Sequence, residues 1–125
     1  MTTSWARVAH GPPTFSCPAN VSVGDAVYLT AGGGVDRARA DSAATMSVFG
    51  FVASKPTTTT CSVTSVGSVG NFSLLTPGSV YFVSTTITGG ITGTAPSAVG
   101  HVVQQVGIAT SSSSIVIQLG SPIKL

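Results

Sequence analysis

Short apolar runs rich in β-branched residues alternate with Gly, Pro, Ser and Asn turns along most of the chain. Val, Ile and Thr fit the pleated surface of a strand, and turn signals recur every 8–12 residues or so, as in sandwiches and barrels. Strands are predicted within 26–29, 35–40, 48–53, 57–63, 80–83, 101–109 and 115–119. The predicted fold is all-β: a compact β-sandwich or small barrel of short strands.

Three local patterns make this prediction more specific. The strand 48–53 is expected to end at Lys55-Pro56, because proline cannot donate to a strand ladder. The segment 101–109 alternates as one strand that places Val102, Val106 and Ile108 on one face. Residues 41–45 are small, and they predict a loop or a short helical turn.

The two halves of the chain resemble each other. Val27-Tyr28-Leu29 matches Val80-Tyr81-Phe82, Gly33-Gly34-Val35 matches Gly89-Gly90-Ile91, and Gly50-Phe51-Val52-Ala53 matches Gly107-Ile108-Ala109, at offsets of 53, 56 and 57 residues. Two such units, 21–54 and 75–110, could bury one apolar face each by packing together. The alternative is chance recurrence in a chain rich in Val and Gly. The prediction is one domain, 20–125, built from two pseudo-repeated halves.

Charge is scarce. Only 6% of the 125 residues are charged, against about 25% in ordinary soluble proteins, whereas 35 residues are Ser or Thr. The net charge of +2 offers no basic patch for nucleic acid, and no apolar run is long enough for a membrane-spanning helix. The start of the chain lacks a signal-peptide pattern, which predicts synthesis in a cytosol. We expect other subunits to cover much of the surface, and the eight charged residues to lie on its rim or outward face.

Residues 1–19 are predicted to form an extended N-terminal arm, because Gly11-Pro12-Pro13 and Pro18 oppose helix and central-strand structure. One interpretation is a first edge strand and a turn, with Trp5 in the core. The other is an arm that docks on a partner, since Trp and Arg are common interface anchors. The candidate interface residues are Trp5, Arg7, His10, Pro12 and Pro13.

Arrangements typical of enzymes are missing. There is no Glu, no Gly-x-Ser-x-Gly elbow and no phosphate-binding Gly-x-x-x-x-Gly-Lys motif, so a small hydrolase built from scattered Ser, His and Asp is set aside. The spacing of His10, His101, Cys17 and Cys61 gives no zinc-binding pair. The two cysteines could form a disulfide, but a cytosolic origin favours two buried free thiols. We therefore predict no enzyme activity, no metal and no cofactor.

Several segments resemble a small β-module of tailed-phage virion proteins. In the second half these segments are 75–84 with Pro77-Gly78, 89–92, 95–96 and the Val-Gln-Gln-Val-Gly-Ile-Ala strand at 103–109; in the first half they are 24–29 and 50–53. The module occurs in capsid decoration (cement) proteins and in tail-fibre or head-fibre domains. The resemblance implies a homotrimer that binds the major capsid protein on the outer capsid surface and stabilises the head. The alternative that it implies is a fibre β-domain for host-surface recognition.

Overall fold

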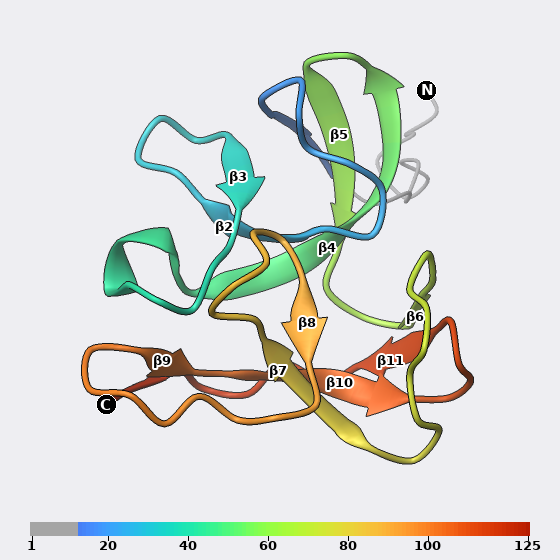
Figure 1. Cartoon of the computed structure of the whole chain (residues 1–125). Coiled ribbons are helices and arrows are strands. Elements are labelled where there is room, and N and C mark those ends of the chain that lie inside the picture. The colour runs from blue at the N-terminus through green and yellow to red at the C-terminus, as the bar shows by residue number, and fades with distance from the viewer. Residues whose placement is uncertain (1–12) are drawn as a thin grey trace, which may run out of the picture.

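The computed structural model describes residues 13–125, which form two five-stranded antiparallel sheets and a small two-stranded one (Figure 1). The first sheet has the order β1-β5-β4-β2-β3. Its strands are β1 (Thr14–Ser16), β2 (Ala26–Leu29), β3 (Val35–Arg37), β4 (Val48–Thr57) and β5 (Thr60–Thr64). A 3-10 helix at Ala43–Thr45, capped by the Ser42 side chain, confirms the short helical turn predicted between β3 and β4.

The second sheet has the order β6-β11-β10-β7-β8. Its strands are β6 (Ser68–Val69), β7 (Val80–Val83), β8 (Ile91–Thr92), β10 (Gln105–Ala109) and β11 (Ile115–Ile117). The two remaining strands, β9 (Val102–Val103) and β12 (Ile123–Lys124), pair with each other near the C-terminus (Figure 1). The all-β prediction is confirmed, and because the sheets stay open the sandwich fits and a closed barrel does not.

Two strand predictions are corrected. β4 continues past Lys55-Pro56 to Thr57, because the register between β4 and β5 shifts there and Pro56 lies beyond the reach of β2. The predicted strand 101–109 is broken at Gln104 into β9 and β10. A further register shift between Gln105 and Gly107 moves Ile108 to the opposite face from Val106 and leaves Ala109 in the core.

The predicted repeat extends to whole sheets. Replacing β1, β2, β3, β4 and β5 by β6, β7, β8, β10 and β11 converts the strand order of the first sheet into that of the second. Val27 lies opposite Gly50, as Tyr81 lies opposite Gly107, so the offset between β2 and β7 is 54 residues and not the 53 predicted. The shared Val-Tyr dipeptide suggested that Val27 matches Val80. The strand register instead matches Val27 with Tyr81, because both side chains point into the core.

Each sheet curves around apolar side chains of its own. One cluster fills the first sheet: Cys17, Val21, Val27, Val35, Val52, Cys61 and Val63. The larger cluster fills the second sheet and also reaches the other face of the first: Ala26, Ala38, Ala40, Val48, Phe51, Val69, Tyr81, Val83, Val106, Ala109, Ile115 and Ile117. The first sheet is therefore buried on both faces, one against its own strands and one against the second half.

Backbone hydrogen bonds join the halves. Ala26 N–H donates to Gly89 O (2.9 Å), Gly89 N–H donates to Ala38 O (2.7 Å), and Ala40 N–H donates to Ser84 O (2.9 Å). The three alanines are fully buried, so these bonds are shielded from water. Small side chains let the two backbones approach this closely, and the joint fixes one half against the other.

A buried amide completes the joint. Gln104 is only 2% exposed; its Oε1 accepts from Val48 N–H (2.9 Å), and its Nε2 donates to Val48 O (3.0 Å) and to Gly120 O (3.1 Å). The side chain thereby supplies the partners that the first residue of β4 would otherwise lack. Gln104 is also the residue at which the strand predicted over 101–109 breaks.

Candidate functional site

The predicted interface residues lie mostly beyond the described part of the chain. Trp5, Arg7, His10 and Pro12 fall outside residues 13–125, whereas Pro13 is exposed and its carbonyl accepts from Val63 N–H (3.0 Å). Within the predicted arm 1–19, Thr14–Ser16 form an edge strand on β5 and Cys17 is buried, which agrees with the first of the two interpretations, although Trp5 lies outside the described residues. An edge strand tolerates flanking prolines, since only one side of it is paired.

Charged side chains are confined to the first half and the two ends of the chain. Six of the eight lie between residues 25 and 55, and residues 56–123 contain no Asp, Glu, Lys or Arg. In the first half, Arg39 forms an ion pair with Asp41 (3.1 Å), and Asp36 lines a groove. Asp41 and Lys124 are exposed, and the other described charges are half-buried. That the charged residues lie on the rim or outward face of an assembly stays a prediction.

The uncharged second half exposes apolar side chains instead. Of nine large hydrophobic residues exposed within residues 13–125, six lie between 56 and 123: Val66, Val80, Ile87, Leu74, Val99 and Ile123. Leu74 is 94% exposed and has a φ of 60°, a conformation that costs a non-glycine residue free energy. Isolated apolar residues on a surface are ordinary, and what distinguishes this stretch is that no charged side chain lies among them.

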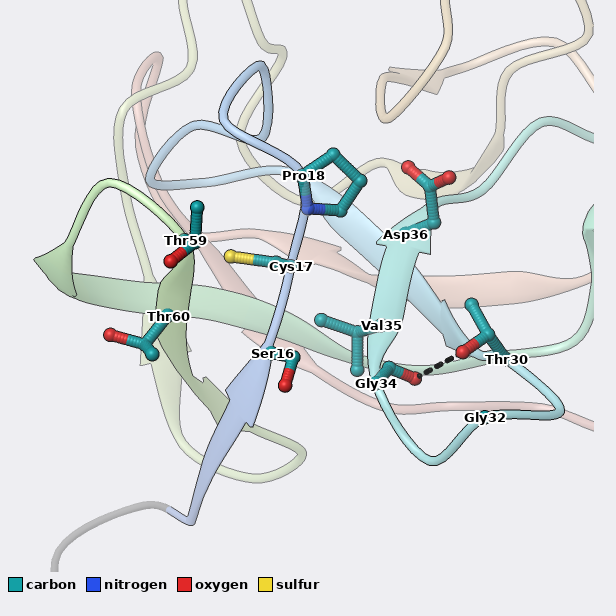
Figure 2. A pocket seen from close by; sticks show the side chains of 10 residues that line it. All are labelled: Ser16, Cys17, Pro18, Thr30, Gly32, Gly34, Val35, Asp36, Thr59 and Thr60. Carbon is teal, nitrogen blue, oxygen red and sulfur yellow. Dashed lines mark hydrogen bonds between the residues drawn. The ribbon is translucent and has the colours of Figure 1, made fainter.

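A groove opens at the edge of the first sheet (Figure 2). It encloses about 500 Å³ between the end of β1, the turn that joins β2 to β3, and the β4–β5 turn. Its lining residues are Ser16, Cys17, Pro18, Thr30, Gly32, Gly34, Val35, Asp36, Thr59 and Thr60. Thr30 Oγ1 donates to Gly34 O (3.1 Å) and holds the turn, as the dashed line in Figure 2 shows. The lining combines apolar groups of Cys17, Pro18 and Val35 with threonine and serine hydroxyls, glycine backbone and one carboxylate, which suits an extended peptide segment or a turn.

Cys17 lines the groove, and it belongs to the same apolar cluster as Cys61. Cys17 and Cys61 are both free thiols and both buried. Burial, together with the neighbouring Cys17 thiol, raises the pKa of Cys61 to about 12, so this thiol stays protonated at neutral pH. Because the thiolate is the reactive form of cysteine, Cys61 is suited to core packing and not to nucleophilic chemistry.

Asp25 lies at the joint between the halves. Its Oδ2 accepts from Ser22 N–H (2.8 Å), and a Cβ added at Gly89 would lie 3.0 Å from its Cγ. Burial raises the pKa of Asp25 above its ordinary value of 3.8, against the lowering effects of the Ser22 hydrogen bond and of the positive charges of Arg37 and Lys55. The neutral carboxyl is therefore favoured more strongly in the folded state than in the unfolded state.

Replacing Asp25 by asparagine should change how stability depends on pH. Below pH 3.8 the carboxyl is protonated in both states, and above 3.8 the unfolded state ionises first, so the wild type loses stability until the pH passes the folded pKa. The Asp25→Asn variant lacks this loss. Urea unfolding at pH 3 and pH 7 should show the variant gaining on the wild type at the higher pH; equal changes at both pH values would refute the assignment.

Residues 13–125 hold no group of three or more His, Cys, Asp or Glu side chains that could bind a metal ion. Among the same residues, no helix is long and apolar enough to cross a membrane. No family model, curated protein or solved structure matches the chain.

Proposed function

We propose that the protein is a phage capsid decoration protein, a homotrimer that binds the major capsid protein on the outside of the virion and stabilises the head. The observation that carries the proposal is the run of residues 56–123, which has no charged side chain and exposes Val66, Leu74 and Val99. The resemblance of 75–84 and 103–109 to virion β-modules supports the same function.

The physical basis is low-cost burial of surface. A specific interface covers about 800 Å² on each partner, a modest part of the 6475 Å² accessible surface of this chain. Hydroxyl and apolar groups lose less hydration energy than charges when a partner covers them. In this proposal the protein acts by binding alone: each copy bridges neighbouring capsid subunits, and many such bridges must break before the shell opens.

The N-terminal arm is the proposed capsid contact, with Trp5 as its anchor and Arg7 paired with capsid carboxylates. Deleting residues 1–12 should abolish binding to capsids but leave the domain folded, because the first sheet begins at Thr14 and its edge strand stays paired to β5. Co-sedimentation with capsids and circular dichroism measure the two effects. Normal capsid binding by the truncated chain would show that the arm is not the contact.

A fibre β-domain for host-surface recognition is the second candidate, because the same modules occur in fibres. Copy number separates the two functions. A decoration protein should be present on virions in numbers comparable to those of the capsid subunits, whereas a fibre component should be present in only a handful of copies. Quantitative mass spectrometry of purified particles makes this measurement, and a low copy number would contradict the decoration function.

A further inference from the structure

At the joint between the halves, a turn of one half inserts into a site on the other. The inserting turn is called the donor, and the site that accepts it is called the receiving site. The donor is the turn Ser22–Asp25, in which Asp25 N–H donates to Ser22 O (3.1 Å). It lies between the segment that follows β6 and the turn that joins β7 to β8. A Cβ added at Gly24 would be 3.0 Å from the Asn71 Cβ, and one added at Gly89 would be 3.0 Å from the Asp25 Cγ.

The repeat places an equivalent donor in the second half. In the turn Thr76–Ser79, Ser79 N–H donates to Thr76 O (3.1 Å), and Gly78 N–H donates to Ala109 O (2.8 Å), just as Gly24 N–H donates to Val52 O (2.9 Å). The two glycines share a left-handed backbone, with φ of +93° and +85°. Apart from its two chain neighbours, no residue within 13–125 comes within 4 Å of a Cβ placed at Gly78, so this second donor is unoccupied there.

The repeat also places an equivalent receiving site in the first half. Gly33 occupies the position of Gly89, and both have positive φ. Each is followed by a glycine, Gly34 or Gly90, whose carbonyl accepts the hydrogen bond that closes the turn. In the second half, the space between the edge strand and this turn receives the Gly24 turn. In the first half, the corresponding space lies between β1 and the β2–β3 turn, and it is the groove of about 500 Å³ (Figure 2).

The sheet face beside the first donor is covered, whereas the equivalent sheet face beside the second donor is exposed. Ala26 and Phe51 are fully buried where the first half meets the second. Their equivalents by strand register are Val80 and Ile108, which face each other across β7 and β10 on the outer side of the second sheet. Val80 is 36% exposed, and Ile108 is half-buried. The face that is covered in the first half is thus left uncovered among residues 13–125 in the second.

We propose that a second copy of this chain occupies the groove: the turn Thr76–Ser79 of one copy inserts between β1 and the β2–β3 turn of the next. The apolar face around Val80 and Ile108 is covered in the same contact. The contact repeats between chains the joint that the two halves form within a chain. It joins unlike surfaces, so it leads to a closed ring or to a filament and not to a two-fold dimer.

This inference rests on the repeat and not on the capsid-binding role. It specifies the surfaces through which the proposed homotrimer would form, and its test uses the purified full-length chain without capsids. Failure of the contact would leave capsid binding untouched, and failure of capsid binding would leave the contact intact.

Complementation between two variants tests the contact. Val80→Arg blocks the donor face, and Gly32→Arg blocks the groove. Apart from its two chain neighbours, no residue within 13–125 comes within 4 Å of a Cβ at Gly32, so the fold tolerates the new side chain. Light scattering should show the wild type as an oligomer and each variant alone as a 12.4-kDa monomer. An equimolar mixture should form a dimer of twice that mass, because each mixed pair keeps one intact donor and one intact groove.

Two further variants serve as controls. Ser79→Arg blocks the donor turn from a different position and should also complement Gly32→Arg. Ala44→Arg, on the exposed 3-10 helix outside both surfaces, should oligomerise like the wild type. Circular dichroism checks that each variant is folded. A monomeric wild type at high micromolar concentration, an oligomer that survives both blocking variants, or a mixture that stays monomeric would each overturn the proposal.

Discussion

Replacing Gly107 by alanine is expected to destabilise the protein by about 3 kcal/mol or more. The added methyl group would fall on the backbone carbonyl oxygen of Val116 in the neighbouring strand, and it would also press on the Ile115 side chain at 3.0 Å. A strand in mid-sheet cannot move away without losing its ladder hydrogen bonds, because Gly107 is paired on both sides, with Tyr81 and with Ile117. Urea unfolding should show a lower midpoint with an unchanged slope.

The repeat supplies a second position for the same experiment. Gly50 lies where Gly107 lies, and a Cβ there would be 2.7 Å from Thr64 O and 2.6 Å from Val63 Cγ1. Gly50→Ala should therefore be similarly harmful. Gly32→Ala is the matched control, because Gly32 is exposed and has an ordinary φ, and the change should cost little. Equal stabilities for all three variants would show that the close strand contact does not exist.

The Gln104→Leu variant should lose about 3 kcal/mol of folding free energy. Leucine nearly preserves the volume but removes the partners of Val48 N–H, Val48 O and Gly120 O. Val48 is buried, and each of its two groups left without a partner costs about 1–3 kcal/mol, whereas Gly120 is exposed and its carbonyl can accept from water. Thermal unfolding should show a fall in Tm on the order of 10 °C.

Gln118→Leu serves as the control for this change, because Gln118 is an exposed glutamine. Its replacement should leave Tm nearly unchanged. If Gln104→Leu is as stable as Gln118→Leu, the buried amide does not hold β4 to the second half, and the joint depends on backbone bonds alone.

Strand content and the repeat could be predicted because they depend on local patterns. Apolar runs such as 48–53 and 80–83 are bounded by turn residues, and the recurring glycines Gly50 and Gly107 mark positions where neighbouring strands approach closely. The 3-10 turn at Ala43–Thr45 follows from a run of small residues after a serine that can cap it.

Other features depend on contacts distant in sequence, and the pattern could not reveal them. The alternation over 101–109 looked continuous, but Gln104 leaves the strand ladder to bond Val48, 56 residues away, and a register shift then turns Ile108 outward. The scarcity of charged residues was visible in the sequence. That most of them belong to one of two structurally similar halves became clear only from the fold. The groove was not predicted at all, because its walls come from β1, the β2–β3 turn and the β4–β5 turn.

The joint between the halves is made largely of main-chain atoms and residues that are small: Ala26, Ala38, Ala40, Gly89 and Ser84. Every residue type except proline carries the same N–H and C=O groups, so such a joint constrains side-chain volume far more than side-chain identity. Related chains could exchange these positions among Ala, Gly and Ser and keep the same architecture. Homology among proteins built in this way would remain detectable in the spacing of small residues after residue identities had diverged.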